Sequence, residues 1–267
     1  MSGLRQLAEL PWLVRRNISL PINHAVIRKR KSDQYIVAFP RSGSTWLRTV
    51  LSGIMDPEKG FDPAVFNRTI PSVGAQYLSL ISSMPDPRLI FSHTVFRPSL
   101  RRVVYLVRDG RDSIVSFYHL ETTRAGVKLP FPEWFNLYCM RRFGPRWDNN
   151  VESWLTRGKE HLVDNILIAK FEDIKKNPLP NIQKITSFLN IPADEAAISR
   201  ALELASIDNA REREKLEKRK LSDPNASFYR GGKTGQWQEL LNGDLYDRFL
   251  KLSRRALHLA GYPEQAS

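Results

Sequence analysis

The chain has 267 residues, of which 42% are hydrophobic and 26% are charged, so it has the composition of a globular protein and not of a disordered one. This length is enough for one large hydrophobic core, and a single domain is the default expectation. Lys and Arg number 41 against 28 Asp and Glu, a net charge of +13, which predicts an anionic partner such as a nucleotide, a polyanion, nucleic acid or a membrane surface.

Cysteine usage and hydropathy restrict the expected compartment. Cys139 is the single cysteine, which excludes an intramolecular disulfide and suits a reducing compartment. No apolar run reaches the ~18 residues of a membrane span. Charged residues and a proline also interrupt the apolar stretch that a secretion signal would need near the N-terminus. We therefore expect a cytoplasmic protein without a membrane span.

The first segment of the chain, residues 1–33, is basic and irregular, and it contains the run Arg28-Lys-Arg-Lys31. We interpret this run as a solvated charge cluster that flanks the first strand, with a membrane or nucleic-acid patch as the alternative. The prediction is a basic N-terminal segment over residues 1–33, followed by one domain over residues 34–267.

Residues 35–54 have the pattern of a strand, a short loop and a helix. Residues 35–39 are an apolar run with β-branched side chains, which predicts a buried parallel strand. Apolar residues then recur at positions 47, 50, 51 and 54, the spacing of one buried helix face, and Gly53 or the pair Asp56-Pro57 is expected to end this helix.

The loop between them, Arg41-Ser42-Gly43-Ser44-Thr45, combines a glycine, three hydroxyls and one cation without a carboxylate. Backbone N–H groups at a helix start lack intrahelical partners and favour an anion, and a glycine lets the backbone approach it closely. The loop therefore predicts a phosphate cradle. The alternative is an ordinary turn with a Ser or Thr cap.

This loop differs from the phosphate loop of common nucleotide hydrolases. The pattern G-x-x-x-x-G-K-[ST] is absent here, and no nearby acidic residue follows a strand in the manner of a Mg²⁺ ligand. Gly231-Gly-Lys-Thr234 matches only the end of that pattern, because Ser227 occupies the earlier glycine position. We therefore predict no metal at this site.

The segment after the first helix is rich in Pro, Ser and Asp. We interpret residues 56–87 as a mobile lid or an acceptor-side segment, with a short helix near residues 72–82. A second strand is predicted over residues 89–93, and it ends in His93.

A third strand is predicted over residues 102–107, and it runs into a helix. Asp109 is expected to cap that helix, with Asp112 completing a capping box. Arg108 then lies at the carboxyl end of a strand, where open α/β sheets bind ligands, and Ser116 lies two turns along the helix. The alternative is that Arg108 pairs with Asp112 and only braces the turn.

Predicted strands and helices continue to alternate in the remainder of the chain. Residues 128–157 are rich in aromatic side chains, which we attribute mostly to packing, with some available for an acceptor pocket. A fourth strand is predicted over residues 165–170, and helices follow it. Residues 211–220 are charged at every position except Leu216 and are interpreted as an exposed, flexible segment.

A Gly-rich basic stretch, residues 228–237, suits an anion better than a core. The last helix is predicted over residues 244–260, with Gly261 at its C-terminal end and apolar positions 245, 249, 252 and 259 buried. Strands that alternate with helices predict an α/β domain with a central, mostly parallel sheet flanked by helices.

Three separated motifs together resemble one known family. Residues 39–46 resemble the 5′-phosphosulfate loop of the sulfotransferases that use 3′-phosphoadenosine 5′-phosphosulfate (PAPS). The segment from Arg108 to Ser116 is similar to their 3′-phosphate motif, and Arg230-Gly-Gly-Lys-Thr-Gly-Gln-Trp237 to their C-terminal Gly-rich loop. The likeness extends from about residue 34 to the C-terminus and is strongest to the cytosolic and bacterial branch that modifies small molecules.

The resemblance implies a role for each matching residue. Residues Arg41 to Thr45 would hold the 5′-phosphosulfate, with Trp46 stacked on adenine. The 3′-phosphate would be held by Arg108, Ser116, Arg230, Gly231 and Gly232. His93 aligns with the catalytic histidine that activates the acceptor hydroxyl, and an imidazole pKa of about 6.5 suits that task. Without the resemblance, His93 would be read as a satisfied core histidine.

Four positions depart from the family pattern. Arg41 replaces a lysine that is common in the animal enzymes, which keeps the charge and changes its geometry. Phe91 stands where those enzymes carry a second lysine. Gly231 replaces a lysine of the C-terminal loop, although Lys233 is close in sequence. Phe171 replaces a tyrosine that contacts adenine, so stacking could persist without the hydroxyl.

The expected activity is transfer of a sulfuryl group from PAPS to a hydroxyl, with an amine as the second choice, on a small-molecule acceptor. Arg41 can neutralise the charge that builds on the departing phosphate, and adenosine 3′,5′-bisphosphate is the expected product. One alternative is a P-loop-like kinase or nucleotide hydrolase, and another is a non-catalytic polyanion binder. No nucleic-acid motif is recognised. The acceptor and the oligomeric state are not determined by the sequence.

Overall fold

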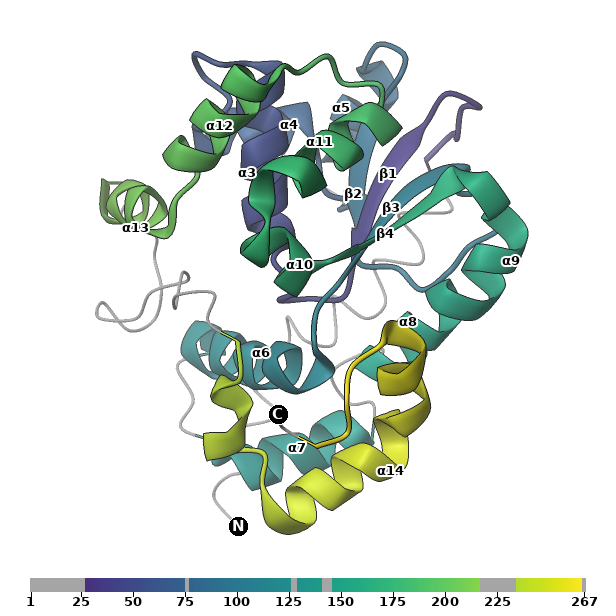
Figure 1. Ribbon diagram of the computed structural model, residues 1–267, viewed down its shortest axis with the longest axis vertical. Helices are drawn as coiled ribbons and strands as arrows, with labels where there is room; N and C mark the ends of the chain where they lie inside the picture. Colours follow the sequence, from purple (N-terminus) through teal and green to yellow (C-terminus); the bar gives the residue numbers. More distant parts are fainter. Residues whose placement is uncertain (1–26, 75–76, 126–128, 141–145, 217–233, 266–267) are drawn as a thin grey trace.

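The computed structural model describes residues 27–74, 77–125, 129–140, 146–216 and 234–265. A four-stranded sheet in the order β2-β1-β3-β4 lies at the centre of the described part (Figure 1). Every strand runs parallel to its neighbours. The strands are β1 (Gln34–Ala38), β2 (Leu89–Ser92), β3 (Arg102–Val107) and β4 (Ile166–Lys170). The predicted α/β domain with a parallel central sheet is confirmed, and each predicted strand is present to within one residue at either end.

Residues of β1 and β3 point alternately into two separate hydrophobic cores, as the two-residue period of a strand requires. Ile36, Ala38, Val104 and Leu106 belong to the core on one face, where they meet buried residues of four helices. These helices are α3 (Ser44–Met55), α10 (Phe171–Lys176), α11 (Pro178–Phe188) and α12 (Glu195–Leu204). Both faces of the sheet are buried, which explains the continuous apolar runs in its strands.

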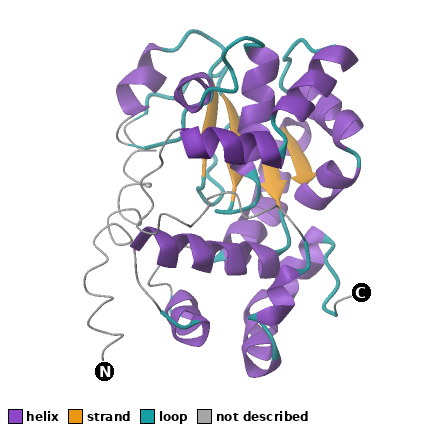
Figure 2. Cartoon of the chain, turned by 90° about the vertical axis from the view of Figure 1, so that its left-hand side faces the viewer, coloured by secondary structure: helices purple, strands orange, loops and turns teal. Residues whose placement is uncertain are grey.

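The second core lies on the opposite face and contains Tyr35, Val37, Val103, Tyr105 and Val107. Figure 2 shows the helices gathered on the two sides of the sheet. The helices that supply this core include α6 (Gly110–Ala125), α7 (Phe131–Cys139), α8 (Trp147–Ser153) and α14 (Gly243–Ala260).

Aromatic side chains dominate this second core. Trp134, Trp147 and Trp154 are almost completely buried, and they contact the rings of Phe117, Tyr105 and several neighbours. Packing therefore accounts for most aromatics of the 128–157 region, as predicted. Phe143, another aromatic residue of this region, lies outside the described residues.

Shorter elements complete the described chain. They are α4 (Pro63–Thr69), α5 (Leu78–Ser83), a π-helical turn η2 (Trp154–Gly158), α9 (Lys159–Leu162), η3 (Val163–Asn165), α13 (Ile207–Leu216) and η4 (Gln236–Glu239). No helix among the described residues is long and apolar enough to cross a membrane.

Part of the segment 56–87, interpreted as a mobile lid or an acceptor-side segment, is packed against the rest of the domain. Phe66 and Ile70 are buried, and the Arg48 guanidinium donates to the Ile70 carbonyl while its Nη2 also donates to Asn67. Ser72 pairs with Phe91 at the edge of the sheet, so the predicted helix begins only at Leu78. A local pattern does not reveal this anchoring, because Arg48 lies on α3, a different element.

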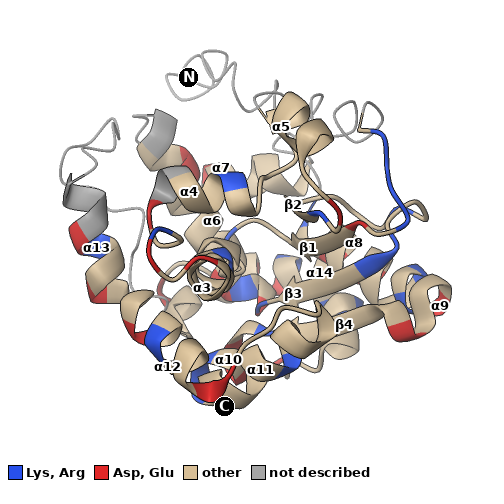
Figure 3. Ribbon diagram, turned by 90° about the horizontal axis from the view of Figure 1, so that it is seen from above, with Lys and Arg blue, Asp and Glu red and all other residues tan. Residues whose placement is uncertain are grey.

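Part of the charged stretch after α12 is helical. Residues 211–216 belong to α13, with Arg211 and Glu212 exposed as predicted, while residues 217–220 lie outside the described part. Arg, Glu and Lys are good helix formers, and Arg211 lies 4.0 Å from Asp208 one turn earlier. Figure 3 shows both charge signs along α12 and α13.

The last helix ends as predicted and buries a different stripe. Gly261 has φ 69° and caps α14 in the left-handed conformation. The buried residues are Phe249, Ser253, Ala256, Leu257 and Ala260, whereas positions 245, 252 and 259 are only partly buried. α14 packs against α8, where the Phe249 ring contacts Trp147.

A buried ion pair closes the amino-terminal edge of the sheet. The Arg88 Nη2 atom lies 2.6 Å from Asp33 Oδ2, and both side chains are 1% exposed. Arg88 also donates to the carbonyls of Ile81 and Arg28. The pair therefore joins the start of β1 to the start of β2.

We predict that Arg88→Ala lowers the free energy of unfolding by about 3–5 kcal/mol, because it leaves the Asp33 carboxylate buried without its cation. Urea unfolding measures this change. Arg254→Ala is the matched control, since its ion pair with Glu264 is exposed and is expected to contribute less than about 1 kcal/mol. Equal losses in the two variants would contradict the prediction.

Candidate active site

The described site residues gather at the carboxyl edge of the parallel sheet. The loop with Arg41 follows β1, His93 follows β2, Arg108 follows β3 and Phe171 follows β4. Because all four strands point the same way, side chains that are far apart in the sequence meet at one edge.

The loop after β1 has the features of an anion cradle. Arg41 and Gly43 both have positive φ angles, 69° and 88°, so the chain turns sharply before α3 begins at Ser44. The Ser42 side chain is fully buried, and its Oγ makes no hydrogen bond among the described residues. The first turn of α3 carries no acidic residue. A buried hydroxyl without a partner, beside the N–H groups of a helix start, fits a bound phosphate or sulfate group.

Position 43 requires a glycine both because of its positive φ angle and because a neighbouring ring leaves no space for a Cβ atom. A Cβ atom at this position would lie 2.4 Å from Cδ2 of the Phe171 ring. Phe171 itself is 4% exposed, so its ring supports the loop from below. The predicted adenine contact of Phe171 stays a prediction, because this ring is buried between Gly43 and Arg108, whose guanidinium lies 5.0 Å from its centroid.

We predict that Gly43→Ala reduces both stability and anion binding, because it adds a clash with Phe171 to the strain of a positive φ, about 1–2 kcal/mol for the strain alone. Thermal unfolding and calorimetry with adenosine 3′,5′-bisphosphate measure the two effects. Gly235→Ala is the matched control, because Gly235 also has a positive φ, 79°, with no atom within 4 Å of the added Cβ. The prediction is wrong if both variants lose the same stability.

Trp46 lies in the first turn of α3 and is half-buried. The Lys175 ammonium from α10 lies 5.7 Å from the centroid of its ring. The stacking role of Trp46 is not tested by these contacts, but Lys175 marks a cation near that ring which the sequence pattern did not single out.

Two of the predicted anion motifs are in direct contact. The Arg41 Nε donates to Ser116 Oγ at 3.0 Å, and the Arg108 Nη1 donates to the Arg41 carbonyl at 3.1 Å. Arg41 belongs to the predicted 5′ motif, whereas Arg108 and Ser116 belong to the predicted 3′ motif. The structure therefore brings the two motifs together at one place on the sheet edge.

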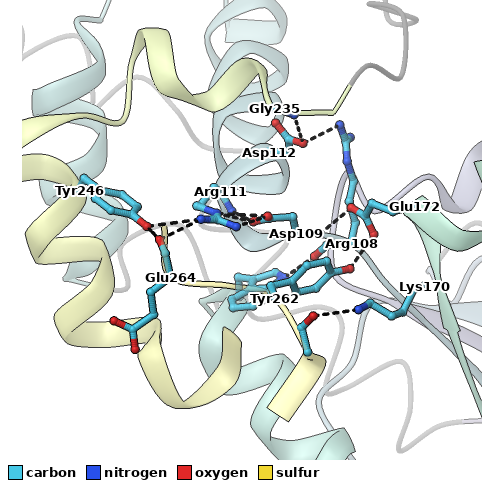
Figure 4. Close-up of polar contacts among 12 residues, drawn as sticks. Arg108, Asp109, Arg111, Asp112, Lys170, Glu172, Gly235, Tyr246, Tyr262 and Glu264 are labelled. Carbon is cyan, nitrogen blue, oxygen red and sulfur yellow. Dashed lines mark hydrogen bonds and ion pairs between the residues drawn. The ribbon is translucent and has the colours of Figure 1, made fainter. Parts of the chain in front are cut away.

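The turn after β3 differs from the predicted capping box (Figure 4). Asp109 does cap α6, since its Oδ1 accepts from the Arg111 N–H at 2.9 Å. The second half of the box is wrong, because the Asp109 N–H donates to Glu172 Oε1 at 3.0 Å. Asp112 instead accepts from the Gly235 N–H at 2.9 Å. Both partners come from distant segments, which a local motif cannot reveal.

Arg108 and Asp112 do approach each other, as the alternative interpretation of Arg108 required. Their closest atoms are 3.8 Å apart, a longer contact than the 3.1 Å hydrogen bond from Arg108 to the Arg41 carbonyl. Burial raises the pKa of Asp112, while the Arg108 charge and the Gly235 N–H act in the opposite direction. Arg108 is therefore held in place by several groups and is not committed to a tight ion pair with Asp112.

His93 is half-buried at the end of β2, next to the end of β1. Its Nδ1 lies 2.7 Å from the Ala38 carbonyl oxygen. Because a carbonyl only accepts, Nδ1 carries the proton, and Nε2 is then the basic nitrogen of the neutral ring. The Phe91 ring meets the imidazole edge-on at a centroid distance of 4.7 Å. The contact from Nδ1 to the Ala38 carbonyl is what a structural core histidine would make. A general base would use Nε2 instead.

The C-terminal motif is described only in part. Arg230, Gly231, Gly232 and Lys233 lie outside the described residues. Trp237 is buried, and the Arg111 guanidinium lies 4.6 Å from the centroid of its ring. Among the described residues no group of three potential metal ligands is found.

Comparison with known proteins identifies relatives along most of the chain. The model of the "Sulfotransferase domain" family matches residues 31–261. Cytosolic sulfotransferase 5 of Arabidopsis thaliana is 26% identical, and the aligned region covers 88% of this chain and 82% of the relative. Flavonol 4′-sulfotransferase of Flaveria chlorifolia is also 26% identical, with 94% and 87% covered.

Solved structures share the fold. The crystal structure of retinol dehydratase in complex with retinol and PAP has a TM-score of 0.67 at 20% identity. The superposed region covers 86% of this chain and 82% of the retinol dehydratase chain. Mouse sulfotransferase SULT7A1 complexed with PAP has the same TM-score at 19% identity, with 91% and 93% covered.

Proposed function

Because the chain belongs to the sulfotransferase domain family, we propose that it uses PAPS as donor and sulfates a hydroxyl group of a small-molecule acceptor. The acceptor oxygen forms a bond to sulfur while the bond from sulfur to the phosphate oxygen breaks. The acceptor proton moves to the protein, and adenosine 3′,5′-bisphosphate leaves. An amine acceptor is the second choice.

The donor fits the residues of the sheet edge. Arg41 to Thr45 would hold the phosphosulfate, Trp46 and Phe171 the adenine, and Arg108 and Ser116 the 3′-phosphate. The buried Ser42 hydroxyl and the α3 N-terminus support the first of these assignments. Arg230, Gly231 and Gly232 would complete the 3′-phosphate site.

His93 acts as the general base in this proposal. The Nδ1–H group is directed to the Ala38 carbonyl, which leaves Nε2 as the nitrogen that accepts the acceptor proton. Arg41 stabilises the negative charge that develops on the departing phosphate oxygen. The observation that carries the proposal is the strand order β2-β1-β3, which brings His93, Arg41 and Arg108 to one edge.

The acceptor class is proposed from the relatives. A flavonol appears in the name of one relative, and retinol and androsterone appear in structures of retinol dehydratase. The aromatic content of residues 128–157 is consistent with an apolar or ring-bearing acceptor. Several relatives are named cytosolic sulfotransferases, and we propose the same compartment here.

The test is to incubate the protein with PAPS and a panel of phenols, alcohols and amines, and to follow release of adenosine 3′,5′-bisphosphate with formation of the sulfated product. Product formation without Mg²⁺ is the expected result. Mg²⁺-stimulated ATP hydrolysis without any binding of the bisphosphate would favour the kinase or hydrolase alternative. Salt-sensitive binding of a polyanion without bisphosphate binding would favour the non-catalytic one.

A further inference from the structure

The residues that follow α14 reach back to the centre of the candidate site. We name residues 261–265 the C-terminal tail. The Lys170 ammonium, at the end of β4, donates to the Gly261 carbonyl at 3.1 Å and lies 4.4 Å from the centroid of the Tyr262 ring. Tyr262 is 8% exposed, and its N–H donates to the Leu257 carbonyl at 2.9 Å. The tyrosine is thus fixed on both its ring and its backbone.

The Tyr262 hydroxyl ends on a carboxylate that also holds the Arg108 turn. It donates to Glu172 Oε2 at 2.6 Å, while Glu172 Oε1 accepts from the Asp109 N–H at 3.0 Å (Figure 4). Burial and then the neighbouring Glu172 charge raise the pKa of Tyr262, so its hydroxyl remains a donor at neutral pH. The Glu172 carboxylate therefore contacts both the tail and the turn.

The same turn is held from its other side. The Arg108 carbonyl and the Asp109 N–H belong to the same peptide group. The carbonyl accepts from the Trp147 indole N–H at 3.0 Å, and the N–H donates to Glu172. Phe171, the neighbour of Glu172, lies under the Arg108 guanidinium. The direction in which Arg108 leaves β3 is thus set by Trp147, Phe171 and Glu172 together. Of these, Glu172 accepts a hydrogen bond from the tail.

We propose that Tyr262 is a positioning residue, which orients Arg108 toward the 3′-phosphate of the nucleotide by holding the Glu172 carboxylate. This inference rests on the proposed function, because it assigns the 3′-phosphate to Arg108. It adds the C-terminal tail to the determinants of nucleotide affinity. The tail sets the preference for a nucleotide with a 3′-phosphate over one without it.

The experiment measures the dissociation constants of adenosine 3′,5′-bisphosphate and of adenosine 5′-phosphate by calorimetry. Tyr262→Phe removes one hydrogen bond to a charged group and is expected to reduce the preference for the bisphosphate about tenfold. Binding of adenosine 5′-phosphate is expected to stay near its original value. A general loss of structure would weaken both ligands and leave their ratio unchanged.

Two further variants sharpen the test. Tyr105→Phe is the matched control, because it removes another buried tyrosine hydroxyl, one that donates to Asn150 Oδ1 at 2.9 Å and not to the carboxylate of Glu172. Glu172→Asp keeps the negative charge but is one methylene too short to reach both partners, so it is expected to reproduce the effect of Tyr262→Phe. If Tyr262→Phe does not fold, the nucleotide preference of Glu172→Asp tests the proposal in its place.

The outcomes separate the inference from the proposed function. A parent protein that binds neither nucleotide, or that shows no preference for the bisphosphate, overturns the proposed function. A parent with a clear preference that Tyr262→Phe and Glu172→Asp both retain overturns the role of the tail alone. A drop in the ratio for these two variants and not for Tyr105→Phe supports it.

Discussion

A His93→Ala variant is expected to lose sulfuryl transfer by a factor of about 10²–10⁴, the usual contribution of a positioned general base. The reason is that Nδ1 is occupied by the Ala38 carbonyl, so Nε2 is the nitrogen of this ring that can take the acceptor proton. Turnover with PAPS and a responsive acceptor measures the effect. Binding of adenosine 3′,5′-bisphosphate should change little, because His93 is placed on the acceptor side.

His161→Ala is the control for this experiment. His161 also uses a ring nitrogen against a carbonyl, that of Pro98 at 3.2 Å, but it lies on α9, away from the carboxyl edge where Arg41 and Arg108 meet. It should retain full turnover. An unchanged rate in His93→Ala, in a folded protein that binds the bisphosphate, would remove His93 as the base.

Arg41→Ala is expected to lower turnover by about 10²–10³, the cost of losing one group that stabilises charge in the transition state. The Arg41 Nε is directed to Ser116 at 3.0 Å, which fixes the plane of the guanidinium at the loop. The Arg41 charge stabilises the transition state, in which negative charge builds on the departing phosphate oxygen, more than it stabilises bound PAPS. We therefore expect the fall in kcat to exceed the change in KM for PAPS.

Arg41→Lys separates charge from geometry. A lysine retains the positive charge, and it is the residue that the resembling animal enzymes carry at this position, so we expect it to recover most of the lost rate. Arg255→Ala serves as the surface control, because its side chain is 72% exposed. Equal turnover in Arg41→Ala and the parent protein would contradict the role of Arg41.

The buried Phe91 bears on both predictions. It occupies the position where the resembling enzymes carry a lysine, and its ring contacts His93 on one side while the Arg48 guanidinium lies 4.9 Å from its centroid. Arg48 is directed to the Ile70 carbonyl at 3.0 Å, so its charge stabilises the packing of residues 66–72. In the proposed mechanism, Arg41 and His93 therefore act without a cation at position 91.

Local sequence patterns determined the strands, the cradle loop and the class of the fold. A strand shows itself through a run of apolar β-branched residues and a helix through a repeat of 3.6, and both patterns need only neighbours in the chain. Arg41 and Arg108 could be singled out for the same reason, since each lies just after such a run, whereas His93 was singled out by the resemblance to the sulfotransferases. The capping role of Asp109 was also readable locally, because its partner is two residues away.

Only the tertiary structure decided which of these residues meet. The contact from Arg41 to Ser116 spans 75 residues, and the bridge from Asp109 through Glu172 to Tyr262 joins three elements. Such contacts depend on the strand order and on the rotation of each helix about its axis, and neither is encoded in local periodicity. For this reason the local capping pattern pairs Asp112 with the Asp109 N–H, which in the structure donates to Glu172, and the Glu172–Tyr262 bridge has no sequence signal.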